Sequence, residues 1–405
     1  MSSSTSSSER ALFARILLTI LLGMGAALLL VRTFTYGINV TADNVFGRVL
    51  QAQAALPRIT REPQDLVMFF GSSMVQAGFS PRQFDREMAA RGAPVKSFNF
   101  GFGGLNPLFQ DYLSRRIREQ FERDDRRLKI ALIEFNPFQA THTRRNGARD
   151  AEEAMLAILG TPAEFLDIAL SDPAQGVRLF NIRYLRDGIS AEAFTSYFIA
   201  EQMAPPRART AIPEDEAAKM RRSELDKILE QRFEEDYPDY QGEDWHYGWQ
   251  GGGTIPEERS AETLALFDDY YATLQTEHLL DDDRLSRIHS ADIVELNFDP
   301  ELVEAFIRIV KNFQAISDRV EVVMLPQNTG WIHNPPAAQQ RLAAAVARIE
   351  AATGLVMQNH QHPSSITPEM FADTTHLARY TGGVAYTRHL VEALVPQGEA
   401  AAAVD

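Results

Sequence analysis

The chain has 405 residues, more than a single minimal core needs, so it can hold one large domain with insertions or two domains. Lys and Arg total 40 against 55 for Asp and Glu, and the resulting net charge of -15 repels a polyphosphate backbone, which argues against a nucleic-acid partner. The absence of cysteine excludes disulfides, thiolate catalysis and cysteine-ligated metals, and it suits an oxidising compartment.

The amino terminus predicts a membrane anchor. Residues 11–31 are apolar apart from Arg15 and Thr19, and the uncharged stretch 16–31 approaches the roughly 20 residues that cross a bilayer. It has no polar face, unlike a helix on a soluble core. A cleaved signal peptide is the main alternative, but the small-residue sequence at 40–42 lies well beyond the apolar run. We therefore expect an uncleaved helix at 11–32.

The charges around this helix leave its orientation nearly balanced, because Arg10 and Arg15 precede the uncharged stretch and Arg32 and Arg48 follow it. A short positive tail ahead of an apolar core is nevertheless how export signals begin. The sequence favours a single pass through the bacterial cytoplasmic (inner) membrane, with the tail 1–10 in the cytoplasm and the large domain in the periplasm.

Beyond the anchor, apolar runs alternate with helical patterns. A membrane-proximal connector at 33–62 is expected to contain a helix near 44–55. Three strands, at 66–70, 95–100 and 129–135, are then separated by helices at 81–91 and 107–123. Strands separated by helices of this length imply right-handed parallel crossovers.

The alternation breaks over residues 139–298, which read as a mostly helical, acidic insertion. It resumes with helices at 300–317, 335–352 and 383–395 and with strands at 320–325 and 355–358. The core therefore comprises residues 63–138 and 299–396, and residues 397–405 form a frayed tail. The predicted fold is a three-layer α/β/α sandwich with a parallel sheet, an amino-terminal transmembrane helix and a large helical insertion between the third and fourth strands.

Two short motifs, far apart in the chain, predict a site for acyl transfer. Gly71-Ser72-Ser73 ends the first strand, where open α/β sheets hold their reactive groups, and Asp373-Thr374-Thr375-His376 precedes the last helix. A serine needs a neighbouring imidazole to accept its proton, and the imidazole needs an acid to orient it. We predict Ser73 as nucleophile, His376 as base and Asp373 as orienting acid. A helix-capping turn and a chance Asp-x-x-His are the alternatives.

With these motifs the chain resembles the SGNH hydrolase superfamily, also called GDSL-type esterases. The family's first block, Gly-Asp-Ser, is matched at 71–73 with serine in place of the acid, and its fifth block, Asp-x-x-His, is matched by Asp373 and His376. The resemblance covers about residues 66–136 and 320–395. It implies the SGNH fold, with the backbone N–H of Ser73 as one oxyanion donor.

The family's remaining blocks match less evenly. The second block, an asparagine with an oxyanion glycine, is matched by Asn99 and Gly104. The third block, Gly-x-Asn-Asp, is where the chain departs, because Asn136 lies nearby but out of register. The resemblance therefore implies an oxyanion role for Gly104 and a weaker one for Asn136.

The Gly-Ser-Ser variant with an amino-terminal anchor resembles the envelope proteins of teichoic-acid D-alanylation and alginate O-acetylation. That implies a membrane-anchored, extracytoplasmic esterase or O-acyl(acetyl)transferase that acts on an envelope or exported polysaccharide through an acyl-serine. It needs no cofactor, and its partners include the acylated glycan and a multi-pass membrane acyltransferase. Hydrolysis and transfer share the acyl-serine, so the sequence leaves both open. A catalytically inactive glycan-binding or assembly protein of the same fold and a secreted lipid or thioester esterase are the alternatives.

Other patterns have weaker interpretations. Gln76, one turn after Ser73, either adds an oxyanion donor or is simply solvated. Trp245 and Trp249, in a glycine-rich loop, either stack on sugar rings or anchor the insertion. His360 and His362 have metal-ligand spacing but no evident third ligand, so we predict a polar loop and no metal site. Residues 281–283, three aspartates, read as a solvated helix cap.

Overall fold

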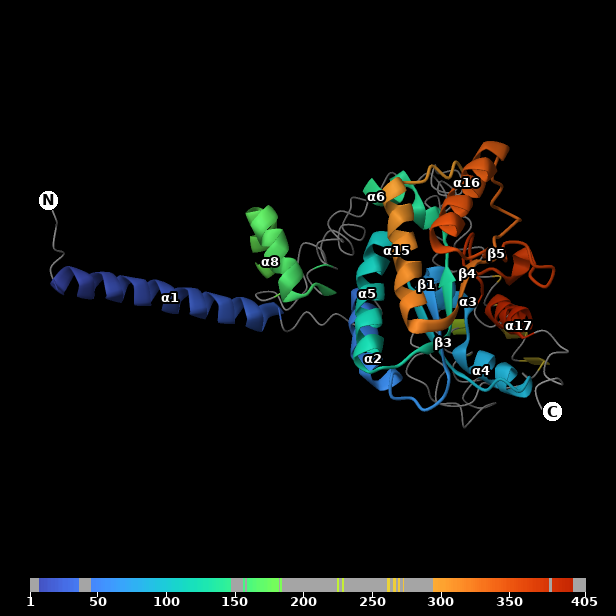
Figure 1. Ribbon diagram of the computed structural model, residues 1–405, viewed down its shortest axis with the longest axis horizontal. Helices are drawn as coiled ribbons and strands as arrows, with labels where there is room; N and C mark the ends of the chain where they lie inside the picture. Colours follow the sequence, from blue (N-terminus) through green and yellow to red (C-terminus); the bar gives the residue numbers. More distant parts are fainter. Residues whose placement is uncertain are drawn as a thin grey trace. The chain divides into compact units, whose positions relative to one another are not determined.

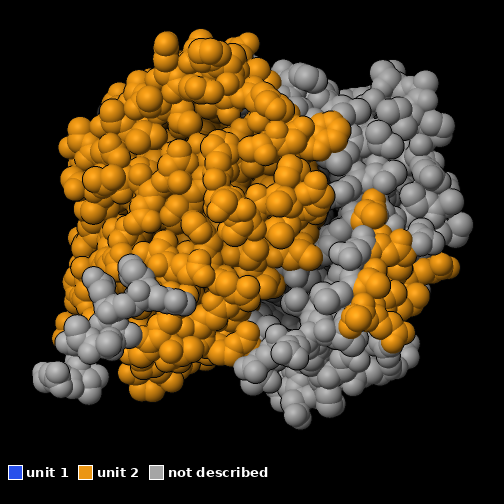
Figure 2. All heavy atoms as spheres, turned by 90° about the vertical axis from the view of Figure 1, so that its right-hand side faces the viewer, with its two compact units in different colours: residues 1–41, 150–205 blue, residues 42–149, 206–405 orange. Residues whose placement is uncertain are grey.

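The computed structural model describes residues 7–35, 45–146, 159–181, 294–378 and 381–395, with isolated positions between 156 and 272. The chain divides into two compact units, residues 1–41 with 150–205 and residues 42–149 with 206–405. Figure 2 shows the second unit in orange. This unit contains the whole α/β core.

The core is built on a five-stranded sheet in the order β2-β1-β3-β4-β5, and every adjacent pair of strands is parallel. The strands are β1 (Leu66–Ser72), β2 (Lys96–Phe102), β3 (Leu128–Glu134), β4 (Ser317–Met324) and β5 (Met357–Asn359). Because the strands are parallel, their carboxyl ends share one edge, and that edge brings together chain segments far apart in sequence.

Helices cover both faces of the sheet (Figure 1). One face carries α2 (Val45–Ile59), α5 (Pro107–Arg123) and α15 (Pro300–Ile316), and the other carries α3 (Ser73–Gly78), α4 (Pro81–Ala90) and α17 (Gly382–Leu394). The remaining long helix of the core, α16 (Pro336–Thr353), packs on α15.

Strand β1 is the most deeply buried part of the core, since all its residues are buried. Successive side chains point to opposite faces of a strand. Accordingly Phe69 packs on Phe79 with ring centroids 5.2 Å apart, whereas Phe70 packs on Phe313 of α15 at 5.1 Å. A continuous apolar run therefore fills both helical layers, as expected for a buried parallel strand.

The predicted α/β class and parallel sheet are confirmed, and the helix expected at 107–123 has the observed bounds. Strand β1 continues to Ser72, two residues beyond its predicted end, and the short helix α3 was not predicted. The predicted boundary between α15 and β4 was wrong, since the strand follows the helix directly at Ser317. The predicted connector contains α2, which packs against α5 and β2 and so belongs to the core unit.

The two ends of the predicted insertion lie side by side. Thr141 pairs with Phe298 in an antiparallel bridge, and the His142 backbone N–H donates to Asn297 O at 3.0 Å. His142 Nδ1 also lies 2.8 Å from Asp299 Oδ2. These contacts join the point where the chain leaves the core to the point where it returns.

Helix α1 (Ser7–Thr35) belongs to the first unit, as do α8 (Pro162–Ser171) and α9 (Pro173–Phe180). Its described side chains, at positions 11–27, 29 and 30, are all exposed and mostly apolar. Among the described residues, none of the helices combines the length and apolarity required to traverse a bilayer.

Candidate active site

The sheet edge brings together a serine, a histidine and an aspartate. Ser73 Oγ lies 2.7 Å from His376 Nε2, and His376 Nδ1 lies 2.8 Å from Asp373 Oδ2 and 3.0 Å from Oδ1. With Nδ1–H donating to the carboxylate, Nε2 is left to accept the serine proton, which is the tautomer that a general base needs. The imidazole is 26 % exposed and the carboxylate 9 %, so solvent reaches the base while the acid is shielded.

The segment around Asp373 is held by its own carboxylate. Oδ1 accepts the backbone N–H groups of Thr375 and His376, both at 2.7 Å. Asn328 Nδ2, from the loop after β4, donates to Asp373 O at 3.2 Å. These contacts fix the three-residue turn that lets the aspartate and the histidine of Asp-x-x-His face each other.

The two serines after β1 have different roles. Ser72 caps α3, and its hydroxyl accepts from Met74 N at 3.2 Å and from Asn136 Nδ2 at 3.1 Å while it donates to Glu134 Oε1 at 2.9 Å. One donor and two acceptors exhaust a hydroxyl. Ser72 is therefore committed to the turn, and Ser73 is the hydroxyl that faces the base.

Glu134, the last residue of β3, lies beneath this turn and was missed by the sequence analysis. Its Oε2 accepts the Ser72 N–H at 2.5 Å, and its side chain is fully enclosed. Burial raises the pKa of Glu134 from 4.5 to about 7, although the Ser72 hydrogen bonds and the neighbouring His376 act in the opposite direction. Gly71 makes room for this carboxyl, because a Cβ there would overlap Glu134 and Val75.

The end of β2 forms the wall opposite Ser73. Asn99 Nδ2 donates to the carbonyls of Phe79 at 2.8 Å and Val75 at 3.1 Å, and Asn99 Oδ1 accepts from Gly101 N at 3.0 Å. A Cβ on Gly103 would lie 3.7 Å from Ser73 Cβ, and Gly104 has a φ of 73° that favours glycine. The loop of Gly103 and Gly104, called the glycine loop below, thus lies beside Ser73.

A buried arginine supports this loop from behind and was also missed. Arg48, on α2 and 2 % exposed, donates from Nε to Gly101 O at 2.6 Å and from Nη2 to Asn99 O at 3.2 Å. Its guanidinium lies 5.6 Å from the centre of the Phe102 ring. A helix assigned to the connector therefore reaches the glycine loop.

Asn136 lies beside the turn. Its Nδ2 donates to Ser72 Oγ and, at 3.4 Å, to Met74 Sδ, and its side chain also forms a hydrogen bond that lowers the pKa of Glu134. Oδ1 accepts from Phe138 N at 3.0 Å. In this arrangement Asn136 stabilises the Ser72 turn, and an oxyanion role would require its amide to leave Met74.

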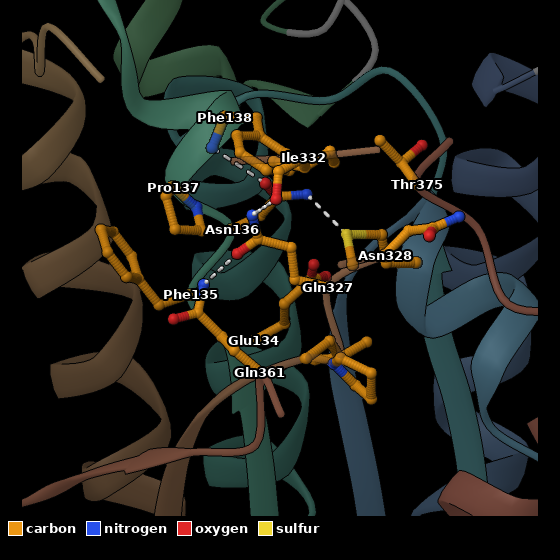
Figure 3. Close-up of a pocket in the computed structure, with 13 residues that line it drawn as sticks. Glu134, Phe135, Asn136, Pro137, Phe138, Gln327, Asn328, Ile332, Gln361 and Thr375 are labelled. Carbon is orange, nitrogen blue, oxygen red and sulfur yellow. Dashed lines mark hydrogen bonds between the residues drawn. The ribbon is translucent and has the colours of Figure 1, made fainter. Parts of the chain in front are cut away.

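A narrow pocket opens next to Asn136, as Figure 3 shows, with Thr375 and Asn328 on its other side. Met74 also lines it. Its volume of about 10 Å³ is close to the least that can hold one water molecule. Met74 follows Ser73 in the chain and Thr375 precedes His376, but neither Ser73 nor His376 is among the residues that line the pocket.

Of the other predicted residues, the structure describes Gln76 but not the two tryptophans or the three aspartates. Gln76 Oε1 would lie 3.6 Å from a Cβ on Gly103, which places the Gln76 amide beside the glycine loop. Trp245, Trp249 and the aspartates at 281–283 lie outside the described residues.

The predicted polar loop at 360–362 is mostly buried, since both His360 and Gln361 are buried. His362 is exposed, whereas His360 is buried, 3.3 Å from Tyr386 Oη and 3.2 Å from Gln358 Oε1. Burial lowers the pKa of His360 to about 4, so it is neutral at physiological pH. Within the described part of the chain, no group of three or more His, Cys, Asp and Glu is arranged to hold a metal.

Comparison with models of known protein families gives no match, and comparison with curated protein sequences gives none either.

Proposed function

We propose that this chain is a serine-dependent acyl-transfer enzyme of the SGNH type, with Ser73 as nucleophile, His376 as general base and Asp373 as the acid that orients the base. The proposal rests on the continuous hydrogen bonding from Ser73 Oγ through the imidazole to Asp373, at 2.7 Å and 2.8 Å. The saturated hydroxyl of Ser72 supports the choice of Ser73, since it has no capacity left to face a base.

The geometry supports a two-step reaction. Ser73 Oγ attacks an ester carbonyl while His376 Nε2 takes its proton, so that a C–O bond forms as the O–H bond breaks. The oxyanion collapses, the bond to the alcohol breaks, and His376 returns the proton to that alcohol, leaving an acyl-serine. Water or a sugar hydroxyl then takes the acyl group by the same steps in reverse.

The oxyanion would be held by the backbone N–H groups of Ser73 and Gly104. A donor of this kind contributes about 3 to 4 kcal/mol to transition-state stabilisation in comparable sites. The closeness of Gly103 to Ser73 supports this assignment.

The substrate we propose is a small acyl ester, such as an acetyl ester, on an envelope or exported polysaccharide. The resemblance to alginate O-acetylation proteins supports a small acyl group. The resemblance to envelope acylation proteins supports the glycan, and with it a multi-pass membrane acyltransferase as partner.

We place the enzyme on the outer side of the cytoplasmic membrane, held by the apolar segment at 11–31. The exposed leucines and isoleucines of α1 support an apolar environment for that helix. The full chain should sediment with membranes and stay there after an alkaline wash, whereas a chain lacking residues 1–32 should not. Release of the full chain by the wash would remove the anchor from the proposal.

The test of the chemistry is covalent labelling of the full chain in detergent by a fluorophosphonate probe. The unmodified chain and a Ser365→Ala control, which alters an exposed serine that is not one of the proposed site residues, should label, and Ser73→Ala should not. Absence of labelling in the folded unmodified chain, with retained polysaccharide binding, would favour the inactive glycan-binding alternative. An acetyl ester supplied with an oligosaccharide acceptor would then separate transfer from hydrolysis by the product formed.

A further inference from the structure

Beneath the nucleophile lies a carboxyl group that the proposed reaction does not use directly. We infer that Glu134 is a positioning residue whose ionised carboxylate holds the Ser72 turn, and through it Ser73, in the reactive arrangement. Protonation of Glu134 then releases the turn and lowers activity. This inference rests on the proposed function and adds to it a built-in dependence on pH.

The hydrogen bonds around Glu134 require the ionised form. Oε2 accepts the Ser72 N–H at 2.5 Å and Oε1 accepts the Ser72 hydroxyl at 2.9 Å. The hydroxyl cannot reverse its direction, because Met74 N and Asn136 Nδ2 already occupy its lone pairs. If either carboxyl oxygen is protonated, its O–H finds no hydrogen-bond acceptor among these groups. The hydrogen bonds from Glu134 to Ser72 are then weakened.

The hydrogen bonds between Glu134 and Ser72 affect the position of Ser73 Oγ through the backbone. Ser72 is the cap of α3 and Ser73 is the first residue of that helix, so a shift of the Ser72 backbone moves Ser73 Oγ relative to His376. The Ser73–His376 contact of 2.7 Å leaves little tolerance, because proton transfer needs heavy atoms about 2.6 to 3.2 Å apart. The absence of a Cβ at Gly71 lets the carboxyl lie this close to the strand.

Among the described residues, few titratable groups face Glu134. His376 lies near enough that its positive charge, formed during the reaction, stabilises the carboxylate. Tyr386 of α17 is buried, and burial together with the charge of Glu134 raises its pKa well above 10, so it stays neutral. His360, bonded to Tyr386, is also neutral because burial holds its pKa near 4. Since burial brings the pKa of Glu134 to about 7, its ionisation changes near neutral pH.

The test is the pH dependence of kcat/KM for a small acetyl ester from pH 5 to 9, using the full chain in detergent. In the unmodified enzyme both Glu134 and the proposed base His376 must be without a proton for the reaction to proceed. A plot of the logarithm of kcat/KM against pH should therefore have a slope approaching 2 at low pH. In Glu134→Gln the slope should fall to 1, with a plateau at least about 10-fold lower. Glu321→Gln, a control at another strand carboxylate, should keep the original profile.

A second variant separates positioning from folding. Ser72→Ala keeps Glu134 but removes a hydrogen bond that lowers its pKa, so the acidic limb should move to higher pH. An unchanged slope in Glu134→Gln, or an unmoved limb in Ser72→Ala, would overturn the inference. If Ser73→Ala retained probe labelling, the proposed function itself would fail, whereas loss of labelling with unchanged pH profiles would remove only the role of Glu134.

Discussion

A consequence of the buried Glu134 is that its contribution to the protein's stability should fall as pH rises, and Glu134→Gln should remove that contribution. The pKa is raised in the folded state, from 4.5 to about 7, because the carboxyl is enclosed. Between these values the unfolded chain releases its proton while the folded chain keeps it. At this site the unfolded state then binds fewer protons, so the contribution of Glu134 to the free energy of unfolding falls with rising pH until the folded group also ionises near pH 7.

The size of the effect follows from the same values. A pKa that rises from 4.5 to about 7, at about 1.4 kcal/mol for each pH unit, corresponds to about 3 kcal/mol of lost stability. Glutamine has nearly the shape of glutamic acid and does not titrate. The free energy of unfolding of Glu134→Gln, relative to the unmodified chain, should therefore improve by up to about 3 kcal/mol between pH 4 and pH 8, since the other titrating groups are shared.

The assay is urea unfolding followed by circular dichroism at several pH values, with both chains in the same detergent. Glu321→Gln serves as the control and should track the unmodified chain. A constant difference between Glu134→Gln and the unmodified chain across this range would show that Glu134 does not titrate in the folded state, and the reasoning would be refuted. A variant that gains stability at pH 8 while losing activity would show that the buried charge is kept for function.

Three further predictions follow from the site. Asp373→Asn should lower kcat/KM by roughly 10³-fold or more while the chain stays folded, because the imidazole loses the acid that fixes its tautomer; a loss below 10-fold would contradict this role. Arg48→Met should lower the free energy of unfolding by about 2 kcal/mol or more and slow probe labelling, because the buried carbonyls of Asn99 and Gly101 lose the hydrogen bonds from Arg48. The control Arg58→Met, at the exposed end of α2, should have neither effect. Gly71→Ala should lower the free energy of unfolding by about 2 kcal/mol in urea titrations, because the added Cβ overlaps Glu134 and Val75. An unchanged midpoint of urea unfolding would mean that the strand can shift to accommodate the methyl group without loss of stability.

The sequence predicted the structure best where a feature depends on residues that are close together in the chain. The run before Gly71 is wholly apolar and lies in a strand buried on both faces, and Asn106-Pro107 opens α5 as a helix cap followed by a first-position proline. The separation of Asp373 from His376 is enough for a turn to bring their side chains together. These features depend on neighbours in the chain, so they can be read without coordinates.

Glu134 and Arg48 could not be assigned in the same way, because their partners are remote. Glu134 closes an apolar run and resembles any polar residue at a strand end until the pairing of β1 with β3 places it under Ser72, 62 residues earlier. Arg48 lies in a short helix that the sequence alone assigns to a connector, and its acceptors are on β2. Ser72 stands where the Gly-Asp-Ser block that it resembles has an acid, and in the structure a carboxylate from another strand, that of Glu134, binds Ser72.

The account depends on Ser73 Oγ forming the covalent bond to the acyl group. The most direct measurement is mass spectrometry of peptides from the full chain after reaction with a fluorophosphonate or a slow acetyl ester, with fragmentation that distinguishes Ser72 from Ser73. The adduct should lie on Ser73 and should disappear in His376→Ala. An adduct on Ser72 or on another residue, or no adduct in the folded protein, would contradict the account.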